Sequence, residues 1–339
     1  LEVTRDPAAT AGATLAVDAA PDGAEDKAAL FAMLERHLPP GAVLATAAAG
    51  IDGLAAGLRD PGRLLGLQFH APAHAAPLLE VVRGARTSDT ALATGFALAR
   101  LLGKVPVPAG VCDGFIANRI LARCGEAVDT VLMDGTNPWE LDEAMVDFGY
   151  AMRPYEAQDL SGLDIAHANR RRQDATRDPA RRYIPIADRM VAEGRLGRKI
   201  GVGWYRYPGG GGKIVDPLVE DLVREEAHFA GVTRTEYGPP EIQRRLTLAM
   251  INEAADILQE GIAQSAADID LVTVLGYGFP RWRGGLMHYA DTLGMGEINA
   301  QLMALAKEDP VAWRPSALIE KLSAEGRTFA NGPRHGSAS

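Results

Sequence analysis

A regular alternation of short apolar runs with helical patterns over the first 110 residues constrains the fold of this chain more than any other feature. The apolar runs are bounded by turn-forming residues, which is typical of buried parallel strands. Alternating strands and helices predict a parallel sheet with crossover helices. The predicted elements are a strand at 14–20, a helix at 25–37, a strand at 41–49, a helix at 51–58, a strand at 64–69 and a helix running into a strand over 98–110.

Beyond residue 110 the pattern changes to helices with few strands. Helical periodicity predicts helices at 114–134, 138–147 and 184–194, and the glycines of 209–212 predict a flexible joint. The fold class we predict is therefore α/β plus all-α, with the boundary near residue 110.

The helical part contains an internal repeat. The segment Glu126–Asp129 matches Glu253–Asp256, and Gly149-Tyr150 matches Gly276-Tyr277, both at a separation of 127 residues. Two further pairs match at a separation of 132 residues, namely Asp159 with Asp291 and Gly162 with Gly294. Such coincidences predict two copies of one helical unit.

Composition excludes several classes of protein. A net charge of −9 argues against nucleic acid or an anionic membrane surface as a partner. The only cysteines, Cys112 and Cys124, lack the spacing of a metal site, so we predict no metal and buried free thiols. The sequence has no run of about 18 apolar residues and no signal peptide, which predicts a cytoplasmic protein without a membrane span.

Four segments, in this order, resemble the 3-hydroxyacyl-CoA dehydrogenase family, and specifically the dehydrogenase part of the multifunctional fatty-acid β-oxidation α-subunit. They are GLQFHAPAHAAPLLEVVRG (66–84), GKVPVPAGVCDGFIANRIL (103–121), GRLGRKIGVGWYRY (194–207) and GYGFPRWRGGLMHYADTLG (276–294). The resemblance implies an NAD-dependent oxidoreductase that converts 3-hydroxyacyl-CoA to 3-oxoacyl-CoA. It also implies a homodimer or a complex with a thiolase subunit.

The resemblance divides the chain as well. It implies a partial Rossmann-type NAD-binding domain at 1–110, a first helical C-terminal domain at 111–208, a linker at 209–237, a second helical C-terminal domain at 238–330 and a disordered tail at 331–339. The first strand and its G-x-G-x-x-G fingerprint are missing from the first domain, and Leu1 is expected to follow them. The resemblance implies NAD as the cofactor, and without this fingerprint we expect the chain as given to bind it poorly. The cofactor contacts that the resemblance implies fall on Asp22 and Lys27.

The catalytic positions of the family are matched only in part. Its glutamate falls on Glu80, which we predict at an apolar helix start, and its asparagine falls on Asn118 near another helix start. Its catalytic histidine is replaced by Gln68, whose carboxamide cannot accept a proton near neutral pH. Its serine is replaced by Ala49.

Two nearby histidines are possible substitutes for the missing base. Residues two apart on a strand face the same side, so His70 points the same way as Gln68, and His74 follows in the same segment. A partly buried histidine without a catalytic task stays the alternative for each.

Two hypotheses follow. In the first, the chain is an active dehydrogenase; in the second, it is an inactive or fragmentary relative that binds acyl-CoA or a β-oxidation partner subunit. The basic clusters 170–172 and 181–182 are candidates for contact with CoA phosphates, with a solvated basic face as the alternative.

Overall fold

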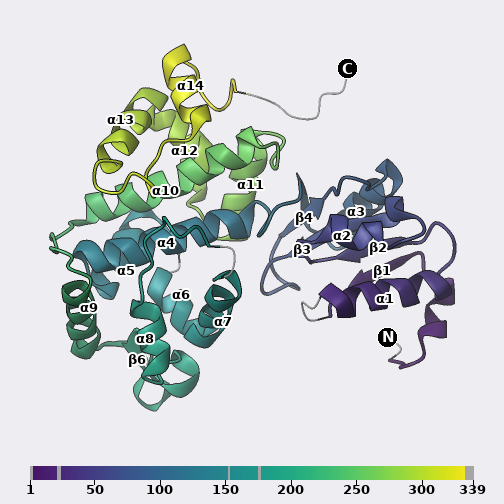
Figure 1. Ribbon diagram of the computed structural model, residues 1–339, viewed down its shortest axis with the longest axis horizontal. Coiled ribbons are helices and arrows are strands. Elements are labelled where there is room, and N and C mark those ends of the chain that lie inside the picture. Colours follow the sequence, from purple (N-terminus) through teal and green to yellow (C-terminus); the bar gives the residue numbers. More distant parts are fainter. Residues whose placement is uncertain (1–2, 21–23, 152, 175–176, 333–339) are drawn as a thin grey trace. The chain divides into compact units, whose positions relative to one another are not determined.

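The computed structural model describes residues 3–20, 24–151, 153–174 and 177–332. The chain divides into two compact units (Figure 1). Unit 1 comprises Leu1–Arg119, Asp256–Tyr277 and Phe329–Ser339, and unit 2 comprises Ile120–Ala255 and Gly278–Thr328. Asp22 and residues 333–339 of the predicted tail lie outside the described residues.

The α/β part of unit 1 contains the alternating elements that the sequence predicts. They are η1 (Pro7–Gly12), β1 (Leu15–Asp18), α1 (Ala24–His37), β2 (Val43–Thr46), α2 (Ile51–Ala56), η2 (Pro61–Arg63), β3 (Leu64–Phe69), β4 (Leu78–Val82), α3 (Asp89–Leu101) and β5 (Val105–Ala109).

The strands form one sheet in the order β1-β2-β3-β4-β5. All neighbouring pairs are parallel except β3 and β4, which are antiparallel. The prediction of a helix start at Glu80 is wrong, because this residue lies in the middle of β4. All five residues of β4 are buried, so the run shows no polar alternation that would distinguish a strand from a buried helix.

The two faces of the sheet have different surroundings. One face carries Leu65, Leu67, Leu79 and Val81, which pack in a core with apolar residues of α3. Gly95 of α3 lies so close to this face that a Cβ there would be 2.6 Å from Leu65 Cδ1.

The opposite face is also largely buried, because Leu64, Glu80 and Val82 on it are each 0% exposed. A Cβ at Gly66 would lie 2.6 Å from Ile51 Cδ1 of α2, so α2 covers this end of β3. Gln68 and Glu80 lie on this second face, because side chains alternate along a strand and Gly66 and Gln68 are two residues apart.

The remaining chain is mostly helical, and the internal repeat is confirmed. Helices α4 to α8 have lengths of 19, 11, 8, 11 and 7 residues, and α10 to α14 have lengths of 21, 11, 8, 11 and 9. The first series is α4 (Ala117–Gly135), α5 (Pro138–Phe148), α6 (Pro154–Ser161), α7 (Leu163–Gln173) and α8 (Ile186–Ala192). The second is α10 (Pro239–Gln259), α11 (Ala266–Gly276), α12 (Leu286–Leu293), α13 (Met295–Leu305) and α14 (Ala317–Glu325), with η5 (Arg281–Arg283) before α12.

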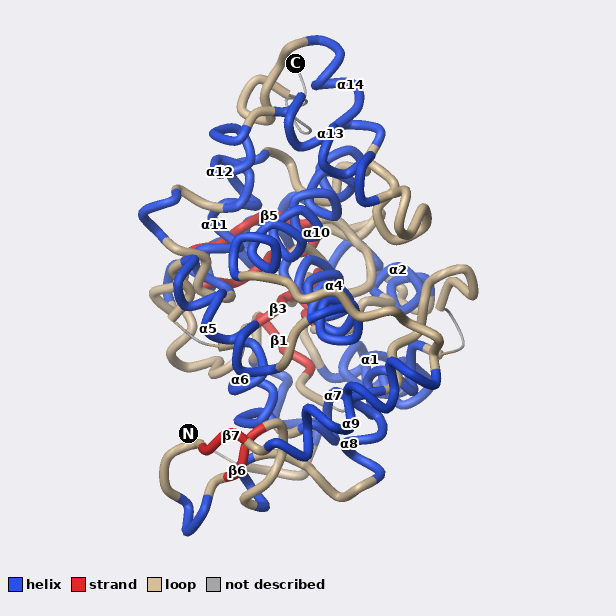
Figure 2. Tube along the Cα trace, turned by 90° about the vertical axis from the view of Figure 1, so that its left-hand side faces the viewer, coloured by secondary structure: helices blue, strands red, loops and turns tan. Residues whose placement is uncertain are grey.

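Between the two series lie η3 (Arg198–Ile200), β6 (Tyr205–Arg206), η4 (Pro208–Gly210), β7 (Ile214–Val215) and α9 (Pro217–Phe229). The segment 209–237, predicted as a linker, thus contains a strand and a helix. Strands β6 and β7 pair as a separate antiparallel ribbon (Figure 2).

The glycine-rich segment before β6 has a structural role. The buried carboxylate of Asp159 accepts hydrogen bonds from the backbone N–H groups of Trp204 at 2.8 Å and Tyr205 at 2.9 Å. A Cβ at Gly203 would lie 1.9 Å from Asp159 Oδ1, so only glycine fits there. This contact explains the sequence pattern around residues 201–207 without a ligand.

Candidate active site

The candidate site is built on the antiparallel pair β3–β4 of unit 1. Gln68 and Glu80 are direct partners in the register, so their side chains lie on the same face of the sheet. His70 follows the last residue of β3 and is two residues beyond Gln68. The register places Gln68 beside Glu80, and His70 follows two residues further along the chain.

His70 and Glu80 form a buried pair. The Nε2 atom of His70 lies 3.1 Å from Oε1 of Glu80, and the two side chains are 7% and 0% exposed. A carboxylate only accepts hydrogen bonds, so we assign the proton on this ring to Nε2. The second ring nitrogen, Nδ1, makes no hydrogen bond in the described part of the chain and is left with its lone pair.

The Glu80 carboxylate is also held by backbone amides at the start of α4. The N–H of Ile116 donates to Oε2 at 2.9 Å, and the N–H of Ala117 donates to Oε1 at 3.4 Å. The first N–H groups of a helix have no partner within the helix and carry a partial positive charge, so they stabilise a carboxylate there. Glu80 is thus fixed by the backbone independently of His70.

A tight turn brings these amides to the carboxylate. Phe115 has a φ of 52° and Gly114 a φ of 78°. A Cβ at Gly114 would lie 2.9 Å from the backbone nitrogen of Arg119, so glycine is needed for the chain to enter α4 this closely. The amides of Ile116 and Ala117 were not predicted from the sequence, although the Asp-Gly-Phe turn before a helical pattern is a signal for such an anion-binding helix start.

Asn118 and Gln68 are the other side chains available to a ligand. Asn118 lies in the first turn of α4 and is exposed, and its side chain has no hydrogen-bond partner in the described part of the chain. Gln68 is half-buried, and within the described part of the chain its Nε2 donates to the backbone oxygen of Phe69 at 3.3 Å. His74 is exposed in the segment between β3 and β4, and no contact brings it to Glu80.

The predicted cofactor contact Lys27 is engaged with other protein groups. Its Nζ lies 2.6 Å from Asp18 Oδ2 and 2.9 Å from the backbone oxygen of Ala20. Thr46 donates to the same Asp18 oxygen at 2.9 Å. Burial alone would raise the pKa of Asp18, but hydrogen bonds from Lys27, Ala20 and Thr46 outweigh it and lower the pKa below its usual value.

The carboxyl end of β2 supplies no further polar side chain, because residues 47–49 are all alanine. No G-x-G-x-x-G occurs in the sequence either. The residues of this sequence therefore do not supply a pyrophosphate-binding turn of this kind.

The basic clusters are already neutralised for the most part. Arg170 pairs with Asp188 at 2.6 Å, Arg181 with Glu126 at 2.6 Å and Arg182 with Asp134 at 2.7 Å. These pairs favour a solvated, ion-paired face over a phosphate site.

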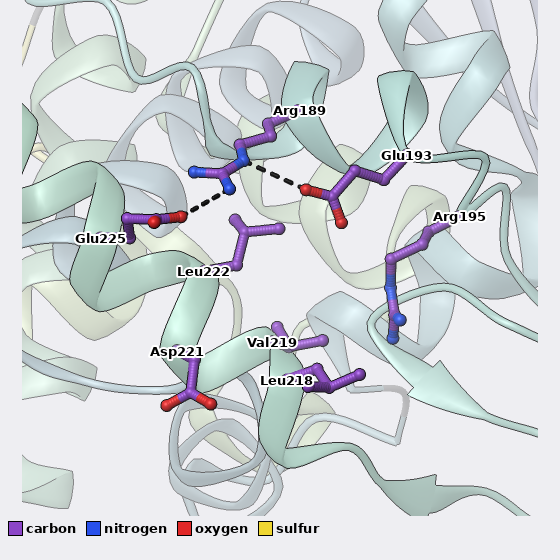
Figure 3. A pocket seen from close by; sticks show the side chains of 8 residues that line it. All are labelled: Arg189, Glu193, Arg195, Leu218, Val219, Asp221, Leu222 and Glu225. Carbon is purple, nitrogen blue, oxygen red and sulfur yellow. Dashed lines mark hydrogen bonds and ion pairs between the residues drawn. The ribbon is translucent and has the colours of Figure 1, made fainter.

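A cavity of about 280 Å³ lies elsewhere, in unit 2 (Figure 3). Its two arginines are paired, because Arg189 contacts Glu193 and Glu225 and Arg195 contacts Asp216. It contains none of the predicted site residues. Among the described residues there is no His, Cys, Asp or Glu cluster that could hold a metal ion, and no helix long and apolar enough to cross a membrane.

Comparison with known proteins agrees with this arrangement. The family model for the 3-hydroxyacyl-CoA dehydrogenase NAD binding domain matches residues 1–112, and that for the C-terminal domain matches residues 114–207 and again 242–334. The chain belongs to the 3-hydroxyacyl-CoA dehydrogenase family. The double match of the C-terminal model corresponds to the two helical series of the fold.

Relatives in this family include the peroxisomal bifunctional enzyme of Danio rerio, which is 37% identical over 88% of this chain and 44% of its own length. The fatty acid oxidation complex subunit alpha of Acinetobacter baumannii is 32% identical over 84% of this chain and 41% of its own length. The chain thus spans less than half the length of these relatives.

Solved structures show the same fold. The 3-hydroxybutyryl-CoA dehydrogenase from Escherichia coli K12 superimposes with a TM-score of 0.80 at 26% identity, over 95% of this chain and 84% of that one. The dehydrogenase part of multifunctional enzyme 1 from C. elegans gives a TM-score of 0.69 at 25% identity, over 94% of this chain and 74% of that one.

Proposed function

We propose that this chain performs the 3-hydroxyacyl-CoA dehydrogenase reaction, with His70 as its acid–base group and Glu80 as the positioning residue. The observation that carries the proposal is the 3.1 Å contact between His70 Nε2 and Glu80 Oε1. An imidazole whose tautomer is fixed by a buried carboxylate is a common general base. The family membership of the chain supplies the reaction.

In the oxidation direction, the proton of the substrate's C3 hydroxyl passes to Nδ1 of His70, while the C3 hydrogen leaves as hydride. NAD supplies the hydride acceptor when bound. The C3–O single bond becomes a carbonyl, so 3-hydroxyacyl-CoA becomes 3-oxoacyl-CoA. Glu80 stabilises the imidazolium that forms, and the amides of Ile116 and Ala117 keep the carboxylate in place.

Asn118 supports the same assignment. Its exposed carboxamide lies one residue after Ala117, whose amide holds Glu80, so it is close to the dyad and free to bind a ligand. We assign it to hydrogen bonding with the substrate, as the family resemblance implies.

The alternative of an inactive copy rests on the replacement of the family histidine by Gln68 and of its serine by Ala49. The contact between His70 and Glu80 supports the active alternative against the first of these two reasons. Partners and compartment stay predictions: relatives are named both as peroxisomal enzymes and as a subunit of a fatty acid oxidation complex, so we propose an assembly within β-oxidation and keep the cytoplasmic location as a prediction.

The test is the change in NADH absorbance with acetoacetyl-CoA. Replacing His70 with alanine removes the base and is expected to lower turnover by about 10²–10⁴-fold. The matched control is His74→Ala, which removes an exposed histidine of the same segment and is expected to leave turnover within about twofold of wild type. Equal activity of wild type and His70→Ala would refute the proposal.

A further inference from the structure

The proposed reaction places a negative charge on the substrate's C3 oxygen as its proton leaves. Where the family resemblance implies a serine hydroxyl for this oxygen, this chain has Ala49, and residues 47 and 48 are alanine as well. The one hydroxyl at this strand end, that of Thr46, donates to Asp18 at 2.9 Å. A donor for the oxygen has to come from another element.

Gln68 lies in the correct place to be that donor. It faces Glu80 directly in the register of β3 and β4, and His70 lies two residues further along the chain. A strand rises by about 3.3 Å per residue, so Gln68 and His70 start about 6–7 Å apart on the same face. A spacing of this size leaves room for one ligand oxygen between the two side chains, since a hydrogen bond to each would span about 2.7–3.2 Å.

The carboxamide of Gln68 is also available at little cost. Its hydrogen bond to the backbone oxygen of the next residue, Phe69, is 3.3 Å long and therefore weak. The side chain is half-buried, so it keeps access to a ligand while part of its hydration is already lost. A glutamine has two N–H donors, and a substrate oxygen can replace the local partner without leaving an unpaired group buried.

We infer that Gln68 is a further catalytic residue of this chain: its Nε2 donates a hydrogen bond to the C3 oxygen while His70 Nδ1 takes the proton. Gln68 thus supplies the hydrogen bond that Ala49 cannot make. This inference rests on the proposed function, because it uses the same site and the same substrate class, a 3-hydroxyacyl or 3-oxoacyl thioester.

The experiment compares Gln68→Leu and Gln68→Glu with wild type. Leucine keeps a similar size without a donor, and glutamate keeps the shape but accepts instead of donating. Loss of one preorganised donor to a developing oxyanion costs about 10²-fold in kcat, and we expect both variants to show a loss of this size. A matched control is Gln301→Leu, because Gln301 lies on α13 and donates to the neighbouring Glu297.

A spectroscopic measurement separates this inference from the proposed function. Acetoacetyl-CoA labelled with carbon-13 at C3 is bound to each variant, and the infrared band of the C3 carbonyl is recorded. We expect the band to move to higher frequency in Gln68→Leu, because the carbonyl loses a hydrogen bond. The band in Gln301→Leu should match that of wild type.

The outcomes are distinct. If wild type turns over but neither kcat nor the carbonyl band depends on Gln68, the inference is wrong and the proposed function stands. If wild type binds acetoacetyl-CoA without turnover and the band still depends on Gln68, the hydrogen bond is supported and the proposed function fails. If wild type neither binds nor turns over acetoacetyl-CoA, both are overturned.

Discussion

The ends of the neighbouring strands β2 and β3 differ in the polar side chains that they carry. At the end of β2, the polar positions of the family are occupied by alanines at 47–49, and Thr46 bonds to Asp18 within the protein. At the end of β3, the histidine is absent from position 68, but His70 makes the contact with Glu80. Both differences look the same in a sequence comparison. Only the structure shows that a histidine two residues further along the chain contacts Glu80.

The largest effect on turnover is expected from removing the imidazole at position 70 and placing one at position 68. His70→Phe removes the base and should lower turnover by about 10²–10⁴-fold. Adding Gln68→His to that variant should recover at least tenfold, because position 68 lies directly opposite Glu80 in the register. Turnover is followed through NADH absorbance with acetoacetyl-CoA. A double variant as inactive as His70→Phe would contradict the idea that either position can serve the same carboxylate.

Glu80→Gln tests the positioning residue. A glutamine can still accept the amide of Ile116, but it can also turn its NH₂ group toward His70 and favour the wrong tautomer. We expect kcat to fall by up to about 10⁴-fold, no more than on complete loss of the imidazole. Circular dichroism and the melting temperature check that the fold is kept. Unchanged kcat in a folded variant would show that Glu80 does not orient the base.

Lys27→Met tests whether the ion pair between Lys27 and Asp18, at the ends of β1 and β2, stabilises the fold. Breaking a buried ion pair leaves Asp18 uncompensated and should lower the free energy of unfolding by about 3 kcal/mol. The folded pKa of Asp18 is lowered, so the stabilisation is full above the usual value of 3.8 and is lost as the pH falls through the lowered pKa. The difference between wild type and variant should therefore be larger at pH 7 than at pH 3.

Urea unfolding at the two pH values measures this difference. Thr46→Val, which removes one hydrogen bond from Asp18 and leaves the ion pair, should cost about 1 kcal/mol and is the matched comparison. A Lys27→Met protein as stable as wild type, with a raised KM for NADH, would instead support the cofactor role predicted from the sequence.

The smallest effect is expected from Ala49→Ser, which restores a hydroxyl at the end of β2. One additional hydrogen bond contributes about 0.5–1.5 kcal/mol, so the gain in kcat should be below about tenfold. Ala47→Ser, at an exposed position of the same segment, is the control. A hundredfold gain in kcat for Ala49→Ser would mean that the end of β2 still forms part of the substrate site, as the end of β3 is proposed to do.

The sequence predicted much of the fold for identifiable reasons. β1, β2 and β3 are short apolar runs with clear turn residues, and the repeat of α4–α8 in α10–α14 rests on matched residues at constant spacing. β4 was missed because every one of its side chains is buried, which leaves a pattern that a helix start shares. Its antiparallel pairing with β3 was beyond the reach of periodicity, which gives no strand direction.

The site was predicted less well. The strand rule gave the side on which His70 lies, but not its distance from Glu80, which depends on the register of two strands. Lys27 was predicted to contact the cofactor. In the structure it donates to the buried carboxylate of Asp18, which lies on another element and which the sequence did not point to. The amides of Ile116 and Ala117 carry no side-chain signal at all.

The hydrogen bonds from the amides of Ile116 and Ala117 to Glu80 have a consequence for how the site is judged from sequence. Because the backbone holds the carboxylate, its position does not depend on which neighbouring residue carries the imidazole. An imidazole at position 70 contacts this anchored carboxylate, and position 68 faces it in the strand register. The residue at position 68 alone therefore does not tell whether the carboxylate has a histidine partner.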